Sequence, residues 1–293
     1  MKPHRRNGFW LGFVCAAFIL AAGCVNPVRS KPADTPFLNP VGISNGTNQT
    51  DPPAAGSKKS LWLESAKADL DRFPDRFLEA SKDTFLRIDN IAALLLAGGA
   101  SVAMHNSDAD KNLAENFARH RTFHNFADES LSVIGDPPTH YAATGLWYAI
   151  SAENQDELNK QRALTMITAL SVTGVVTTGL KVIRDNDTPN GQRWAWPSGH
   201  TSSSFAVASV LDEFYGPKVG IPVYALASLV AYRMMDTGDH WGSDVVFGAT
   251  LGWVVGHTIA GKHKNLDVAG FEIVPYVATG NDALTGISLV KNF

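Results

Sequence analysis

The most constraining feature of this chain is a short turn, Pro197-Ser198-Gly199-His200, followed directly by the small and apolar residues 202–211. This pattern predicts that the turn opens a helix, whose first backbone N–H groups lack partners within the helix and can bind an anion. Ser198 adds a hydroxyl, Gly199 allows close approach of the backbone, and His200 adds a proton donor. The turn therefore predicts a site that handles phosphate.

A second segment lies 40 residues further on, where His240 and Asp244 are four residues apart. A histidine so placed can act as a nucleophile that the carboxylate orients. In order and spacing, the two segments resemble the type 2 phosphatidic acid phosphatase superfamily, which also contains the vanadium haloperoxidases. That family has three motifs: Lys-x6-Arg-Pro, Pro-Ser-Gly-His and Ser-Arg-x5-His-x3-Asp. The resemblance covers roughly residues 91–261, and ordered motifs are far more specific than one tetrapeptide.

Two positions depart from the family pattern. Counting from Lys181, the arginine of the first motif falls on Thr188, which is followed by the expected proline. Arg184 is the nearest candidate replacement, because residues three apart share a helix face. In the third motif, Arg233 stands one residue too far from His240. The match is therefore closer at the histidines than at the phosphate-binding cations.

The resemblance implies a role for each matching residue. His240 is expected to attack phosphorus and form a phosphohistidine while Asp244 holds its ring, and His200 is expected to protonate the leaving oxygen and then activate water. The transition state carries negative charge on three equatorial oxygens. The groups expected to bind these oxygens are Lys181, Arg233, Ser198, the Gly199 N–H and Arg184. The family chemistry uses neither a metal ion nor a cofactor.

We therefore expect a metal-independent phosphatase that hydrolyses phosphomonoesters, either lipid phosphates or small soluble phosphoesters. Two alternatives stay open. In a vanadate-dependent haloperoxidase, His240 would bind vanadate and the protein would oxidise halide. In a non-catalytic protein, the site would bind phosphate or a lipid headgroup, since Thr188 cannot supply the charge of the family's arginine. The motifs set neither the substrate nor the oligomeric state.

The N-terminus has the features of an export signal. Basic residues at positions 2 and 4–6 precede an apolar run over 9–22, and the tetrapeptide Ala-Ala-Gly-Cys ends at Cys24. Residues 1–24 resemble a bacterial lipoprotein signal, with Cys24 as the lipidated first residue of the mature protein. We expect an exported, periplasmic protein tethered to the membrane, in particular the outer membrane, by this anchor. An ordinary secretory signal or an uncleaved anchor is the alternative.

Composition excludes several classes of protein. The net charge of −3 does not suggest a nucleic-acid-binding protein. Cys15 and Cys24 are the only cysteines, so the mature domain has no disulfide, thiolate zinc site or cysteine nucleophile. The aspartates within 185–187 and 236–239 show no recognised metal-ligand spacing.

Hydrophobic periodicity predicts an all-α helical bundle of the acid phosphatase and vanadium haloperoxidase type over residues 60–265, after a flexible tether over 25–59. Pro74 should kink or split the first segment, 61–90. Further helices are expected over 91–104, 111–134, 141–152, 163–181, 199–214, 219–235 and 241–260. Over 266–293, two β-rich runs around a polar turn predict a short C-terminal β-hairpin.

Most of the apolar runs are shorter than the roughly 20 residues that a membrane-spanning helix needs. We therefore expect a soluble bundle tethered to the membrane. An integral bundle is the alternative, because many members of the family are integral membrane enzymes.

Overall fold

The computed structural model describes residues 60–261, 266–268, 271–278 and 284–290 of the 293-residue chain. The prediction of an all-α bundle is confirmed. Its helices are α2 (Leu61–Phe85), α3 (Ile88–Asn106), α4 (Ala109–Arg119), α5 (Asn125–Gly135), α6 (Pro137–Glu153), α7 (Glu157–Arg184), α8 (Gly199–Tyr215), α9 (Pro217–Asp236) and α10 (Gly242–Gly261). The predicted signal with Cys24 and the predicted tether lie outside the described residues.

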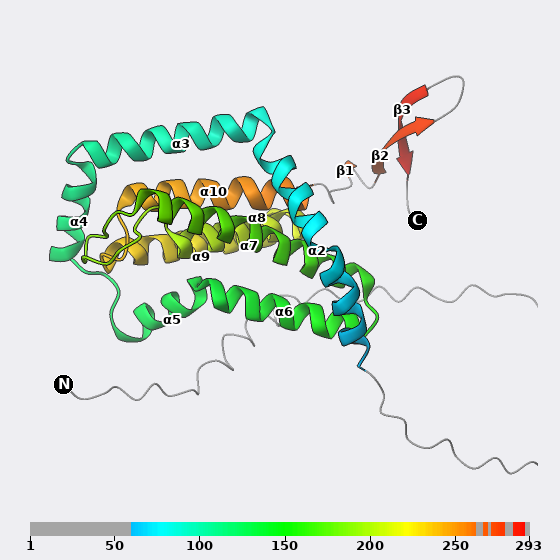
Figure 1. The fold of residues 1–293 in the computed structure, drawn as a ribbon, viewed down its shortest axis with the longest axis horizontal. Coiled ribbons are helices and arrows are strands. Elements are labelled where there is room, and N and C mark those ends of the chain that lie inside the picture. The colour runs from blue at the N-terminus through cyan, green and yellow to red at the C-terminus, as the bar shows by residue number, and fades with distance from the viewer. Residues whose placement is uncertain (1–59, 262–265, 269–270, 279–283, 291–293) are drawn as a thin grey trace, which may run out of the picture.

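Helices α7 to α10 form the centre of the bundle (Figure 1). Helix α3 contacts α10 on one side, α6 contacts α7 on the other, and α2 contacts α3, α6 and α7. The largest buried cluster joins α7, α8 and α10, and at its middle Leu170, Val210, Leu251 and Val255 are at most 1% exposed. Burial of these apolar side chains fixes α8 and α10, which begin within the two predicted motifs.

Glycines on α10 allow a close approach to α8. A Cβ on Gly248 would lie 2.8 Å from the carbonyl oxygen of Ser198, and one on Gly252 would come closer still to that of Ser202. A Cβ on Gly256 would lie 2.7 Å from the carbonyl oxygen of Ala206, one turn further along α8. As the glycines advance along α10, the residues they contact advance along α8, so the two helices run parallel and begin at the same end of the bundle.

Two predicted helix boundaries are wrong. The segment over 61–90 gives a helix that contains Pro74 and ends at Phe85, before α3 begins. The segment over 111–134 forms α4 and α5 instead of one helix. The backbone N–H groups of Thr122 and Phe123 donate to the carboxylate of Asp236, at 2.7 and 2.8 Å, and this binding holds the chain out of a helix between α4 and α5.

At the C-terminal end, β1 (Leu266–Val268), β2 (Phe271–Ala278) and β3 (Leu284–Val290) pair antiparallel in the order β1-β2-β3. In the β2–β3 pair, Val274 lies opposite Ser288. Strand β1 is an addition to the two strands expected over 266–293.

Two of the described helices, α3 and α7, are long and apolar enough to cross a membrane by length and composition. Their surroundings differ. In α7, 56% of the most apolar stretch is buried inside the bundle, whereas in α3 only 17% of the corresponding stretch is buried. Helix α7 therefore has the environment of a core helix. On α3, the side chains of Ile88, Leu95 and Leu96 are each at least 70% exposed.

Candidate active site

The two predicted motifs meet at one end of the bundle. Helices α8 and α10 begin on the same side, and the backbone N–H of Ser198 donates to the carbonyl oxygen of Asp244 at 3.1 Å. The starts of two helices therefore lie close together, and the positive ends of their dipoles favour binding of an anion.

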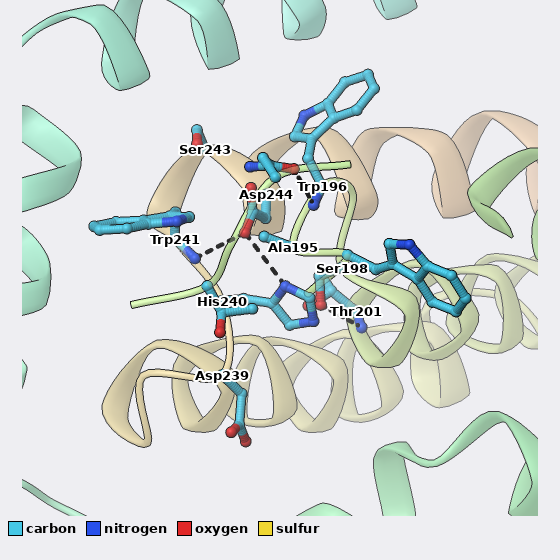
Figure 2. A network of polar contacts seen from close by, with 12 residues as sticks. Ala195, Trp196, Ser198, Thr201, Asp239, His240, Trp241, Ser243 and Asp244 are labelled. Atoms are coloured by element: carbon cyan, nitrogen blue, oxygen red, sulfur yellow. Dashed lines mark hydrogen bonds and ion pairs between the residues drawn. The ribbon is translucent and has the colours of Figure 1, made fainter. Parts of the chain in front are cut away.

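His240 and Asp244 form a buried pair (Figure 2). The distance from His240 Nδ1 to Asp244 Oδ2 is 3.3 Å, and the side chains are 9% and 1% exposed. Because a carboxylate only accepts hydrogen bonds, Nδ1 carries the hydrogen and Nε2 keeps its lone pair. The same carboxylate oxygen accepts the N–H of Trp241 at 2.9 Å, which fixes its position. The pair thus presents Nε2 as a nucleophile.

Ser198 caps the start of α8. Its Oγ accepts the backbone N–H of Thr201 at 3.3 Å, and its side chain is fully buried. Figure 2 shows the His240 ring between Asp244 and this turn. A Cβ on Gly199 would lie 4.0 Å from Cε of Lys181, so the lysine extends along the glycine.

Lys181 reaches the turn from the last turn of α7. Its Nζ donates to the carbonyl oxygens of Trp194 and Ala195, the latter at 3.2 Å. Burial lowers the pKa of Lys181 to about 8, and the charge of Asp244 opposes this shift. The ammonium group therefore lies near the buried pair and is poorly hydrated.

His200 shares this cluster. Burial lowers the pKa of His200 to about 4, and the neighbouring His240, Arg233 and Lys181 act in the same direction, while Asp239 opposes them. A bound phosphate would add negative charge beside the ring and raise the pKa of His200. The structure therefore brings together both predicted histidines and two of the predicted cations.

Arg233 enters the cluster from α9. Its Nε donates to Asp128 at 2.7 Å and its Nη1 to Asp239 at 2.6 Å, and its side chain is 12% exposed. Met234, which occupies the family's arginine position, is buried in the core at 1% exposure. The guanidinium one residue earlier is thus the one that the fold directs to the site.

Two further arginines, Arg184 and Arg193, lie on the α7 end and on the loop that leads to the Pro-Ser-Gly-His turn. The guanidinium carbon of Arg184 lies 5.6 Å from the ring centroid of Trp196, just before the Pro-Ser-Gly-His turn. Arg193 pairs with Asp185 at 2.6 Å and is 71% exposed. Arg184 is therefore next to the turn, whereas Arg193 belongs to the surface.

Thr188, at the position of the family's arginine, shapes the loop between α7 and α8. It is buried, its Oγ1 donates to Asn190 Oδ1 at 2.6 Å, and its N–H donates to the carbonyl oxygen of Gln192 at 2.8 Å. Asn190 in turn donates to Asp239 at 2.8 Å. Thr188 therefore supplies hydrogen bonds that hold the loop against Asp239, the carboxylate that binds the Arg233 guanidinium.

Asp110 on α4 was not predicted, yet it fixes the start of α10. Its carboxylate accepts the backbone N–H of Ser243 at 2.9 Å and the Ser243 hydroxyl at 2.5 Å. A cap from another helix thus positions the turn that carries Asp244. The two partners are 133 residues apart, so no local pattern in the sequence indicates this contact.

In the described part of the chain, no three His, Cys, Asp or Glu side chains are placed to hold a metal ion. The groups that the site offers to a ligand are the lysine and arginine cations, the helix N-termini and two histidines.

Comparisons with known proteins found a curated relative and two solved structures. A segment of 65 residues is 37% identical to the lipid A 1-phosphatase of Porphyromonas gingivalis and covers 21% of this chain, but it spans 15% of the length of that relative. Among solved structures, a transmembrane PAP2 type phosphatidylglycerolphosphate phosphatase from Bacillus subtilis superposes with a TM-score of 0.53. That match covers 60% of this chain and 96% of the other, at 17% identity. LpxE of Aquifex aeolicus has a TM-score of 0.43 over 50% and 93% of the two chains, at 19% identity.

The family model of the PAP2 superfamily matches residues 108–266, which is more than half of the chain. The matched region includes Lys181, the Pro-Ser-Gly-His turn at 197–200, and both His240 and Asp244. The resemblance that the motifs indicate is thereby confirmed, and this chain belongs to the PAP2 superfamily.

Proposed function

We propose that this protein is a metal-independent phosphatase that hydrolyses phosphomonoesters through a phosphohistidine on His240. One observation carries the proposal: the main-chain oxygen of Asp244 accepts the N–H of Ser198, so the His240–Asp244 pair lies beside the helix start that would bind the anion. Family membership supports the same chemistry.

In the first step, Nε2 of His240 attacks phosphorus and the bond from phosphorus to the leaving oxygen breaks. Asp244 holds the hydrogen on Nδ1 and stabilises the positive charge that the ring gains. His200 donates its proton to the leaving oxygen, so the alcohol departs neutral. The products of this step are the phosphohistidine and the alcohol.

In the second step, water attacks the phosphohistidine while neutral His200 accepts a proton from it. The phosphorus–nitrogen bond breaks, inorganic phosphate leaves, and the His240 ring returns to its neutral form. Both protons are accounted for, because the one that His200 gives to the alcohol is replaced by the one it takes from water.

The phosphate oxygens are bound by charge-assisted hydrogen bonds around this centre. We assign these contacts to Lys181, Arg233, Arg184, the Ser198 hydroxyl and the Gly199 N–H. Arg184 is our candidate to replace the missing family arginine, because it lies one turn beyond Lys181 and over Trp196, next to the Pro-Ser-Gly-His turn.

We infer that the substrate is a lipid phosphate. The relatives named lipid A 1-phosphatase and phosphatidylglycerolphosphate phosphatase have names that denote phosphorylated lipids. The exposed apolar face of α3, with Ile88, Leu95 and Leu96, offers a surface that a bilayer would cover. A periplasmic protein held at the membrane through Cys24 would meet such a substrate there.

The test is hydrolysis of p-nitrophenyl phosphate and of phosphatidic acid in detergent micelles, with EDTA present. We expect both to be hydrolysed, and we expect His240→Ala to lower kcat by at least about 10³-fold while leaving the circular dichroism spectrum unchanged. In His200→Ala, a ³²P-labelled phosphohistidine should accumulate, because water is no longer activated.

Other outcomes separate the alternative functions. Activity that EDTA abolishes would contradict metal independence, and near-normal turnover by His240→Ala would exclude this residue as the nucleophile. Bromide oxidation with peroxide and vanadate, without phosphatase activity, would indicate a haloperoxidase. Phosphate binding without any turnover would indicate a non-catalytic binding protein.

A further inference from the structure

A carboxylate outside the family motifs lies beside His200. Oδ1 of Asp136 is 3.7 Å from Nε2 of His200, and the two side chains are 41% and 29% exposed. Asp136 stands between α5 and α6, 64 residues before the histidine in the chain.

This carboxylate is not used by its own helix. An Asp at the N-cap position normally accepts an N–H from the first helical turn. Pro137 and Pro138 have no N–H, and the N–H of Thr139 donates to the main-chain oxygen of Asp136 at 2.9 Å. The side chain of Asp136 makes no capping hydrogen bond. It faces His200 instead.

The junction that carries Asp136 is held against the helix that carries His200. Oγ of Ser203 lies 3.4 Å from the carbonyl oxygen of Gly135, 3.2 Å from that of His200, and 3.2 Å from Nδ1 of His140. A Cβ on Gly135 would overlap the side chain of Val230 on α9, so the backbone is tightly packed there. The fold therefore sets the separation of carboxylate and imidazole.

We propose that Asp136 is a positioning residue for His200. Its carboxylate holds Nε2 of the His200 ring and stabilises the imidazolium, so that Nδ1 of the ring faces the leaving oxygen. This inference rests on the function proposed above. Each histidine then has its own carboxylate partner: His240 has Asp244, four residues further on in the first turn of α10, and His200 has Asp136 on a neighbouring junction.

The charges around His200 show why such a partner matters. The groups that face it from the neighbouring elements are Lys181, Arg233, Asp239, His240, His140 and Asp136. Most of these are cationic or neutral, and Asp239 is already bound by Arg233 at 2.6 Å. Burial raises the pKa of Asp136 and lowers that of His200. An ionised carboxylate at this distance favours the protonated ring that the first step requires.

The experiment compares Asp136→Asn with the wild type on two substrates. The p-nitrophenolate group leaves without protonation, whereas the alkoxide of phosphatidic acid needs a proton. We expect kcat/KM for phosphatidic acid to fall roughly 10-fold or more, within the range that a general acid contributes. The value for p-nitrophenyl phosphate should change little. The alkaline limb of the phosphatidic acid profile should move to lower pH, and Asp136→Glu should recover part of the loss.

Asp156→Asn is the matched control, because Asp156 does cap its helix by accepting the N–H of Asn159 at 3.0 Å. It should leave both substrates and the pH profile unchanged. An equal fall on both substrates with an unmoved pH profile, or no fall on either, overturns the proposal for Asp136.

A second measurement does not depend on turnover. NMR titration of the His200 imidazole should give a lower pKa in Asp136→Asn than in the wild type, and an unchanged value overturns the pairing. A wild type that hydrolyses neither substrate contradicts the proposed function itself, while the titration still decides whether Asp136 and His200 are coupled.

Discussion

At the scale of single residues, Lys181 has the most unusual environment of the phosphate-binding groups. Burial lowers its pKa from 10.5 to about 8, so the ammonium loses its proton as the pH rises through that value. Most of these ammonium groups therefore carry the charge at neutral pH, but they lose it at a lower pH than an exposed lysine does. Phosphate binding to the free protein should weaken over the same pH range.

We accordingly predict that kcat/KM for p-nitrophenyl phosphate falls above about pH 8 in the wild type. In Lys181→Arg this fall should move to higher pH, because a guanidinium stays protonated. The measurement is the pH at which kcat/KM falls on the alkaline limb of the pH profile, rather than the maximum value of kcat/KM. Lys160→Arg, at the other end of α7 and paired with Glu157 at 2.7 Å, should keep the wild-type limb. An identical limb in Lys181→Arg and wild type would assign it to another group.

The residues that sequence alone predicts are those whose partners are near in the chain. His240 and Asp244 are four residues apart, and Ser198 and Gly199 begin a helix, so local patterns suffice to predict that they share a site. Asp136 carries no such signal. Its partner lies on another helix, and the pairing follows from packing between helices that a single sequence does not show.

At the scale of elements, the contact between α8 and α10 determines the geometry of the site. Periodicity predicts each helix by itself, but which helices touch depends on where a side chain is missing. The spacing Gly248, Gly252, Gly256 marks the face of α10 on which the backbone of α8 approaches. This signal is present in the sequence, yet it does not say which helix occupies the groove.

We predict that Gly252→Ala destabilises the fold. Its Cβ would overlap the carbonyl oxygen of Ser202, and such overpacking costs about 1–3 kcal/mol. The melting temperature should fall by roughly 2–4 °C for each kcal/mol. Gly145→Ala on α6 is the control, because its Cβ would meet no atom within 4 Å and alanine favours helix by up to about 1 kcal/mol. Equal melting temperatures for the two variants would contradict the close approach.

At the scale of the whole molecule, the structure presents an apolar face that the sequence did not lead us to expect. The prediction of short apolar runs missed the length of α3, whose exposed side includes Ile88, Leu95 and Leu96. Periodicity failed here because residues 91–100 are all Ile, Leu, Ala or Gly, so this part of α3 has no polar stripe to mark an outer surface. Such a face is costly in water and stable against lipid.

We therefore predict two separate contacts with the membrane, the lipid anchor at Cys24 and the face of α3. In cell fractionation, Cys24→Ser should lower the membrane-bound fraction, and a carbonate wash should release the remainder. Burial of a leucine contributes about 1.5–3 kcal/mol, so Leu95→Asp with Leu96→Asp in the Cys24→Ser background should weaken binding to phosphatidylethanolamine–phosphatidylglycerol vesicles by at least about 10²-fold. Leu158→Asp, at a leucine on α7 that is 62% exposed, should have little effect. If Cys24→Ser protein resists the carbonate wash, the bundle is integral to the membrane and α3 lies within the bilayer, not on its surface.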